Sequence, residues 1–313
     1  MIRERPNHDS PYTKEVVMGE VLVLGATGLV GSMVATRLAA LGVPVRAASR
    51  EPERARAALP GVAAVALDLE RPATFAPALA GIQRVFLIAR PGDEAPDVVA
   101  APLIAAMREA GVERVVDLTA LGIERAAHAP GLRRAELLLE ASGLAFTHLR
   151  PSFFMQLFSA GTLADGLRER GVLAVPAGDA RIAFIDASDV ADVAVRALTE
   201  PGHAGRAYEL TGPDALDHAE VARLVGLAAE RALRYVALDE AQAAAALGAA
   251  GFPPSRVERL LRFYRVVRSG AAATVSPDVE RVLGRAPTAF RDFARRHASA
   301  WRAPAPRAPA ASA

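Results

Sequence analysis

Three glycines spaced three residues apart carry the clearest chemical signal in the sequence. They lie in Gly25-Ala26-Thr27-Gly28-Leu29-Val30-Gly31, which follows an apolar run and opens a segment with helical periodicity. Glycine lets the backbone turn tightly and approach a phosphate, and a helix N-terminus offers free N–H groups and a positive dipole end. We therefore expect this loop to bind the pyrophosphate of a dinucleotide. The expected contacts are Gly25, Thr27, Gly28, Leu29, Val30 and Gly31.

The end of the second apolar run indicates which dinucleotide is bound. An acidic residue there would hold the 2′-hydroxyl of NAD, whereas an arginine accommodates the 2′-phosphate of NADP. This run ends Ala47-Ala48-Ser49-Arg50, and the first carboxylate is Glu51. Arg50 can bind a phosphate through two parallel hydrogen bonds, assisted by Ser49 and by Arg46. The predicted cofactor is NADP(H), and the alternative is that Arg50 is an ordinary surface residue.

Composition excludes several other chemistries. The chain has no cysteine and one lysine, Lys14, so thiolate catalysis, cysteine zinc sites and Schiff-base chemistry are not expected. It contains no GxSxG, no HExxH and no other metal-ligand spacing, and no metal is predicted. A net charge of +2 is no signature of nucleic-acid binding. No apolar stretch approaches the roughly 18 residues of a membrane helix, and no signal peptide is evident, so the expected location is cytoplasmic.

Strand-like apolar runs alternate with helical segments along the first half of the chain. The runs cover residues 21–24, 43–48, 63–67, 84–89, 114–118 and 144–149. The helical segments cover residues 30–41, 52–59, 72–79, 98–110 and 132–141. Strands that are apolar throughout, separated by such helices, predict a parallel sheet covered on both faces. The predicted fold is α/β: a doubly wound Rossmann sheet with a smaller, mostly helical C-terminal substrate cap.

The domain boundaries follow from this alternation. Residues 1–17 are a predicted flexible extension, and residues 302–313 are a predicted disordered tail rich in Pro and Ala. The Rossmann domain covers 18–155 and regains a strand at 183–185, a helix at 188–199 and a strand at 208–210, within returning segments of about 182–212. The cap takes the remainder, 156–181 and 213–301.

Four motifs together point to a known family. They are the GxxGxxG loop, Leu149-Arg150-Pro151-Ser152-Phe153-Phe154-Met155, Phe184-Ile185-Asp186 with Asp189-Val190-Ala191, and Leu210-Thr211-Gly212-Pro213. Over about residues 18–301 the sequence resembles the atypical, NmrA-like branch of the short-chain dehydrogenase/reductase superfamily. The resemblance specifies a nucleotide-binding fold but no substrate.

The resemblance also shows what is missing. Typical short-chain reductases use a Ser–Tyr–Lys group, but none of the four tyrosines lies near the fifth helix, where that Tyr and Lys belong. Many relatives carry Lys or His four residues before the glutamate matching Glu136, and this chain has Leu132 there. Thr119 falls at the family's serine position beside the nicotinamide and could hold a substrate carbonyl; alternatively it merely ends a strand. His128 is a candidate general acid, or a solvated loop histidine.

The resemblance places further contacts around the cofactor. Asp68, after the third strand, would lie near the adenine or cap the next turn. Ala89 and Arg90, at the end of the fourth strand, would meet a cofactor phosphate or a polar substrate, or Arg90 is simply exposed. The turn after the sixth strand would pass under the nicotinamide, through Pro151 and Phe153. A substrate wall for a flat, apolar ligand would comprise Phe153, Phe154, Met155 and Phe158, with plain core packing as the alternative.

Five arginines, Arg256, Arg259, Arg262, Arg265 and Arg268, recur every third residue in one helical segment. They form a solvated face, an anion site or a contact for an acidic partner; their role stays open, and nucleic acid is disfavoured.

Our leading hypothesis is an NADPH-dependent reductase of a small apolar conjugated acceptor: a quinone, an enone or an iminium ion. An iminium accepts hydride without protonation, and the oxygens of a reduced quinone are acidic enough for water to serve. One alternative is a non-catalytic NADP(H) sensor that acts through a protein partner. The other is a non-redox biosynthetic enzyme on the same fold. The oligomeric state is left open.

Overall fold

The structure is a computed structural model that describes residues 19–302, except for 91, 94 and 126–129. The predicted extension, residues 303–313 of the predicted tail and His128 lie outside the described residues. None of the helices in the described part of the chain is long and apolar enough to cross a membrane.

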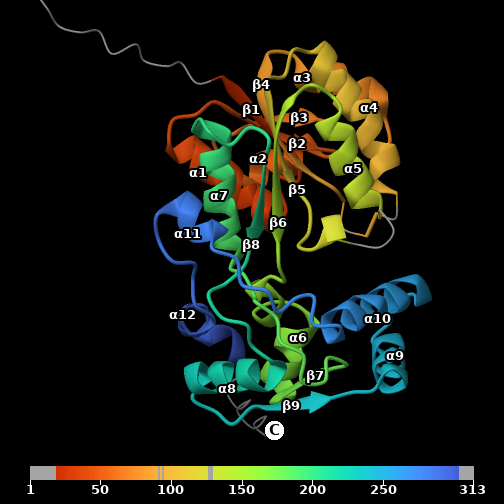
Figure 1. Ribbon diagram of the computed structural model, residues 1–313, viewed down its shortest axis with the longest axis vertical. Coiled ribbons are helices and arrows are strands. Elements are labelled where there is room, and N and C mark those ends of the chain that lie inside the picture. The colour runs from red at the N-terminus through yellow and green to blue at the C-terminus, as the bar shows by residue number, and fades with distance from the viewer. Residues whose placement is uncertain (1–18, 91, 94, 126–129, 303–313) are drawn as a thin grey trace, which may run out of the picture.

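Seven parallel strands form the central sheet, as predicted (Figure 1). In spatial order they are β3 (Ala63–Ala66), β2 (Val45–Ser49), β1 (Glu20–Val23), β4 (Ile82–Ile88), β5 (Arg114–Leu118), β6 (Ala145–Pro151) and β8 (Arg206–Leu210). The chain moves outward from β1 to β3 and then crosses back to β4, so the order reverses between β1 and β4. In open parallel sheets, ligands bind beyond the carboxyl ends of the strands at such a reversal.

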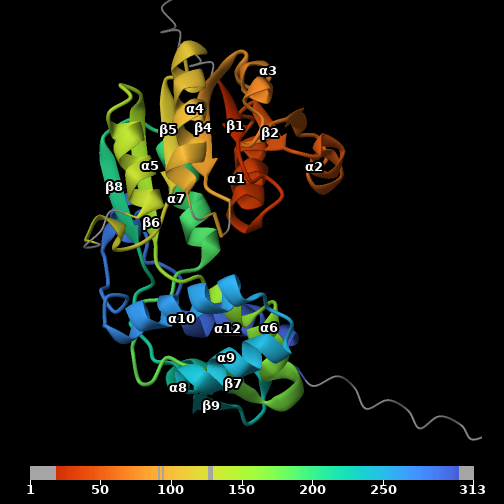
Figure 2. The ribbon, with the colours of Figure 1, turned by 90° about the vertical axis from the view of Figure 1, so that its right-hand side faces the viewer.

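Helices cover both faces of the sheet (Figure 2). One face packs against α1 (Leu29–Ala40), α2 (Pro52–Ala58), α7 (Ala187–Thr199) and α11 (Asp278–Leu283). The other packs against α3 (Phe75–Leu79), α4 (Pro96–Glu109) and α5 (Gly131–Glu140). The inner strands β1, β4 and β5 are largely buried on both sides, which explains why their sequences are mostly apolar and do not alternate, whereas the edge strands β3 and β8 are partly exposed.

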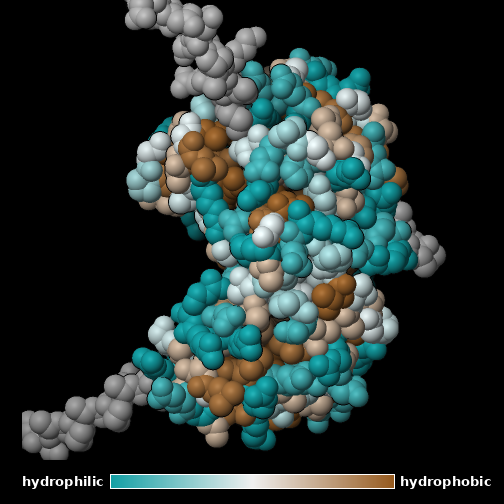
Figure 3. All heavy atoms as spheres, turned by 60° about the vertical axis from the view of Figure 1, so that its left-hand side comes forward, coloured by the Kyte–Doolittle hydropathy of each residue, from teal (hydrophilic) through white to brown (hydrophobic). Residues whose placement is uncertain are grey.

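A second body of structure, here called the small lobe, lies beyond the carboxyl ends of the strands (Figures 1 and 2). It consists of α6 (Thr162–Asp165), β7 (Val172–Val175), α8 (His218–Ala229), β9 (Arg234–Ala237), α9 (Glu240–Ala249), α10 (Pro254–Arg268) and α12 (Phe290–Arg296). The lobe has its own apolar core, which includes Phe158, Phe293 and Trp301. Figure 3 shows the surface deeply notched between this lobe and the Rossmann lobe.

Two local expectations need correction. Residues 183–185 were expected to form a strand, but they make only an isolated bridge, between Ile185 and Phe154. Their backbone is otherwise bonded to loops, as when the amide of Ala183 donates to the carbonyl of Ala272 at 2.9 Å. The small lobe also contains a parallel pair of strands, β7 and β9, which the sequence did not reveal. Each has four residues, too few for a periodicity to be recognised.

Candidate cofactor and substrate site

The glycine loop joins β1 to α1 at the carboxyl edge of the sheet. Gly25 has a φ of +63°, a conformation that favours glycine, and its carbonyl accepts the amide of Gly28 at 2.8 Å to close a tight turn. Gly28 caps α1 with extended backbone and no side-chain hydrogen bond. The first amides of the helix therefore have no capping side chain, and Thr27, Gly28 and Leu29 are exposed.

Gly31 explains why the third position of the loop has no side chain. A Cβ at Gly31 would lie 2.2 Å from the carbonyl oxygen of Gly25 and 3.0 Å from that of Leu24, both backbone atoms. A Cβ at Gly28 would lie 3.2 Å from the Gly25 oxygen. The loop and the first turn of α1 thus pack too closely for a side chain at Gly31, whereas a Cβ at Gly28 would make a tight contact only. The exposed, uncapped helix end has the form that a pyrophosphate requires, so a dinucleotide fits it.

The ends of β2 and β3 carry the predicted adenosine-side residues. Ser49 caps its own turn, because its Oγ accepts the amide of Glu51 at 3.1 Å. Arg50 is exposed and makes no ion pair with any residue that the structure describes. Arg46, by contrast, is paired with Glu20 at 2.5 Å and is engaged away from the cofactor. The carboxylate of Asp68 accepts a hydrogen bond from the amide of Glu70 at 3.1 Å. This favours the alternative that Asp68 caps the following turn over a contact with the adenine.

Ala89 and Arg90 follow β4 and line a hollow at the carboxyl edge. Arg90 is already paired, with Glu70 at 2.7 Å and with Asp93 at 3.6 Å. The hollow is small, with a volume of about 30 Å³, and it reaches Leu132 at the start of α5. Leu132 is the position at which relatives were expected to carry Lys or His. An apolar side chain lines the hollow where that proton donor would stand.

Thr119, directly after β5, is engaged with a buried carboxylate. Its hydroxyl donates to the Oε1 of Glu136 at 2.7 Å, and its amide donates to the carbonyl of Leu149. Glu136 is fully buried and also accepts from Arg150 at 2.8 and 3.0 Å and from Arg133 at 2.7 Å. The hydroxyl proton of Thr119 is thus committed to Glu136, so in this arrangement it is not available to a substrate carbonyl, and only the lone pairs of the oxygen are left.

Glu136 and its partners form a buried ionic network that the sequence did not lead us to expect. Burial would raise the pKa of Glu136, but hydrogen bonds from Arg150 and Thr119 outweigh it and hold the pKa below its usual range. The i, i+3 spacing of Arg133 and Glu136 on one helix was the available signal. Arg150 lowers the pKa of Glu136 more than Arg133 does, but it lies on β6, and only the tertiary structure brings it to Glu136.

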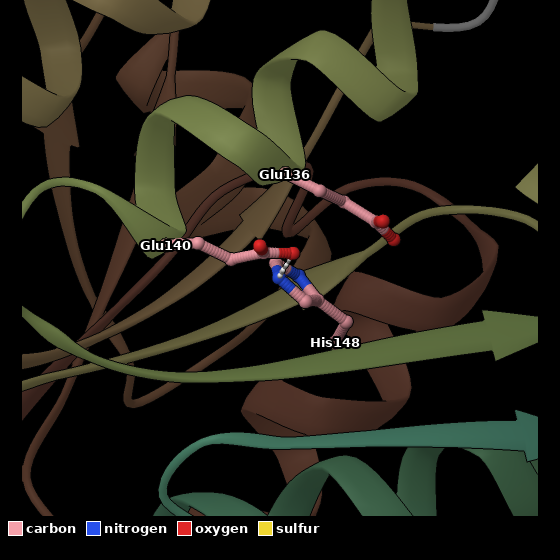
Figure 4. A group of neighbouring side chains, drawn as sticks. All are labelled: Glu136, Glu140 and His148. Carbon is pink, nitrogen blue, oxygen red and sulfur yellow. Dashed lines mark ion pairs between the residues drawn. The ribbon is translucent and has the colours of Figure 1, made fainter. Parts of the chain in front are cut away.

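Asp117 and His148 extend this network along β5 and β6. The ring nitrogens of His148 lie 3.4 Å from carboxylate oxygens of Asp117 and of Glu140. Burial raises the pKa of Asp117, against the opposing effect of His148. Figure 4 shows the side chains of Glu136, Glu140 and His148, the described group whose ligand atoms could reach one metal ion. Arg133 is paired with both glutamates of this group, at 2.7 and 2.6 Å, and Arg150 is paired with Glu136 at 2.8 Å, so these carboxylates already have cationic partners and give no basis for a metal site.

The predicted substrate wall divides into two environments. Phe153 is half-buried, and its ring meets that of Phe263 on α10 edge to face, with centroids 4.1 Å apart. Phe154 is half-buried and packs against the core of the sheet. Met155 and Phe158 are 1% exposed and belong to the core of the small lobe. Their burial favours the core-packing alternative for these two residues and leaves the half-buried rings of Phe153 and Phe154 as the candidates for the substrate wall. Pro151 is buried at the end of β6.

Asp186 and Asp189, from the third motif, tie the two lobes together. Asp186 caps α7 and accepts hydrogen bonds from Gln156 at 2.8 Å and from Arg296 at 2.7 Å. Asp189 accepts the amide of Thr288 at 2.7 Å. Both carboxylates are buried, so this motif positions the C-terminal segment and does not itself face a ligand.

Comparison with known proteins agrees with this geometry. Residues 25–201 match a family model described as NAD(P)H-binding. The chain is 38% identical over 289 residues to an NAD(P)H azoreductase of Xenophilus azovorans, covering 90% of this chain and 99% of that protein. It is also 38% identical over 285 residues to (4-alkanoyl-5-oxo-2,5-dihydrofuran-3-yl)methyl phosphate reductase of Streptomyces griseus, covering 90% and 99%.

Solved structures show the same fold. The NADPH complex of an NADPH-dependent quinone oxidoreductase from Escherichia coli is 26% identical, with a TM-score of 0.80, covering 88% of this chain and 99% of that one. The transcriptional regulator NmrA in complex with NADP is similar in fold, with a TM-score of 0.71 at 16% identity, covering 89% of this chain and 94% of that one.

Proposed function

We propose that this chain, which belongs to the NAD(P)H-binding family and is an oxidoreductase, uses NADPH to reduce a small, largely apolar, conjugated acceptor. The acceptor classes are quinones, enones and iminium ions. When bound, the nicotinamide supplies a hydride, that is, two electrons and one proton. The glycine loop orients the cofactor, and Arg50 selects the 2′-phosphate.

One observation carries the acceptor class: the polar groups at the carboxyl edge are engaged with each other. Thr119 donates its proton to Glu136, and Leu132 stands where a donor would be expected. Among the described residues around Thr119, there is no tyrosine or lysine that could donate a proton to a substrate. An acceptor that takes hydride without a protein acid suits such a site, with water supplying the second proton of a quinone reduction.

The names of the relatives support this proposal. They refer to reduction of an azo compound, of an unsaturated oxo-dihydrofuran and of a quinone, all of which are conjugated acceptors. The half-buried ring of Phe153, backed by Phe263, offers a flat apolar surface for such a molecule. Positioning against this surface would then contribute much of the catalysis.

The test is NADPH oxidation followed by stopped-flow absorbance against a panel of quinones, enones and imines, with NADPH binding measured in parallel. We expect turnover of at least one class. Tight NADPH binding without turnover of any acceptor would overturn the reductase proposal and favour the sensor with a protein partner.

A further inference from the structure

The arginine series of α10 separates into paired and unpaired members. Arg265 is bound by Glu240 at 2.9 Å and by Glu258 at 3.0 Å, and Arg268 is bound by Glu240 as well. Arg256 lies over the ring of Phe252, 4.4 Å from its centroid. These three side chains have roles in joining α10 to α9 and to its own N-terminal turn. The two that remain are Arg259 and Arg262.

Arg259 reaches from the small lobe to the carboxyl edge of the sheet. A Cβ built on Gly92, in the loop after β4, would lie 3.0 Å from the Nη2 of Arg259 and 3.3 Å from its Nη1. Gly92 lies two residues beyond Arg90, which Glu70 and Asp93 neutralise. Arg259 itself is half-buried and makes no ion pair within the part of the chain that the structure describes. A guanidinium in this position can bind an anion through two parallel hydrogen bonds.

The same face of α10 carries the ring that contacts the predicted substrate wall. Phe263 is one helical turn from Arg259, at the i, i+4 spacing that places two side chains side by side. Its ring contacts Phe153 edge to face. Figure 2 shows α10 at the edge of the small lobe that faces the carboxyl ends of the strands. A cation and an apolar surface are thus presented together to the site.

We propose that the acceptor carries an anionic group, a sulfonate, carboxylate or phosphate ester, which Arg259 binds while the conjugated part lies against Phe153 and Phe263. This inference rests on the proposed reductase function and adds the substrate's charge to it. Arginine matches such oxyanions because its planar fork donates two parallel hydrogen bonds. A charge-assisted contact of this type changes an affinity by about 10- to 100-fold.

The experiment compares two acceptors with one skeleton, 1,2-naphthoquinone and 1,2-naphthoquinone-4-sulfonate. In Arg259→Ala we expect kcat/KM for the sulfonate to fall about 10- to 100-fold, mainly through KM, with the neutral quinone unchanged. Arg262→Ala removes the same charge from an exposed position of the same helix and should leave both values unchanged. An equal effect of Arg259→Ala on both quinones, or no effect on either, would overturn the proposal.

Two binding measurements distinguish a wrong anion site from a wrong reductase proposal and from a role of Arg259 in cofactor binding. The NADPH dissociation constant should be the same in Arg259→Ala and in wild type, and a weaker one would show that Arg259 serves the cofactor's phosphates instead. Calorimetry of naphthalene-2-sulfonate with the NADPH-loaded protein reports the anion site without turnover. Binding that is lost in Arg259→Ala, with none of the quinones, enones and imines of the panel reduced, would support the site and refute the reductase; equal binding to both proteins would refute the site.

Discussion

Adding one methyl group to the glycine loop should disable it, and the structure gives the size of the effect. In Gly31→Ala the new Cβ would lie 2.2 Å from the carbonyl oxygen of Gly25, whereas ordinary contact begins at 3.4 Å. The two must separate by about 1.2 Å, and neither belongs to a flexible side chain. Such overpacking typically costs about 1–3 kcal/mol of stability. The same movement shifts the turn at Gly25–Gly28, so NADPH affinity should fall by about tenfold or more.

Chemical denaturation and a titration of NADPH fluorescence measure the two effects separately. Gly28→Ala, with its Cβ 3.2 Å from the same oxygen, should lose little stability but should still weaken NADPH, because the methyl group stands on the exposed helix end. Gly248→Ala is the matched control, since nothing lies within 4 Å of its Cβ and the residue is inside α9. It should bind NADPH normally and be stabilised by about 0.5–1 kcal/mol. Wild-type stability and affinity in Gly31→Ala would refute the reasoning.

Three further changes test other parts of the structure. Arg50→Ala should weaken NADPH by about 10- to 100-fold and leave NADH unchanged, because only the 2′-phosphate contact is lost; an equal loss for both would exclude Arg50 as the phosphate reader. Glu136→Gln should cost up to about 3–5 kcal/mol in urea unfolding at neutral pH, because Arg150 then keeps its buried charge with only Glu124, at 3.3 Å, as a carboxylate partner; wild-type stability would contradict the ionic network. Burial lowers the pKa of His218 from 6.5 to about 4, so the unfolded chain binds this proton more readily. Stability should therefore fall by about 3 kcal/mol as the pH drops from 6.5 to 4, and His218→Gln should lose this component; an identical pH dependence in the variant would count against it.

The order of elements, the parallel sheet and the phosphate-binding loop could be read from the sequence. Each of these depends on neighbours along the chain: apolar runs of four to six residues, the helical segments between them, and the spacing of Gly25, Gly28 and Gly31. Hydrophobic burial and backbone sterics act on such local patterns directly. Local patterns of this kind were therefore sufficient to predict the cofactor.

The roles of individual polar and aromatic side chains depended on the tertiary structure. Thr119 was a candidate to hold a substrate carbonyl until the fold placed Glu136, itself bound by Arg150, against its hydroxyl. Phe158 looked like a pocket wall, and packing between segments far apart in the chain buried it in the small lobe.

The arginines of α10 look equivalent in sequence, yet Glu240 binds Arg265 while Arg259 reaches the loop after β4. A hydrogen bond or ion pair forms only when two groups meet within about 3 Å in the right orientation. For residues tens of positions apart in the sequence, the packing of helices and sheet determines whether the two groups reach this distance and orientation. The sequence by itself therefore determined the scaffold and the place of the cofactor, and the tertiary structure decided which side chains remain available to a substrate.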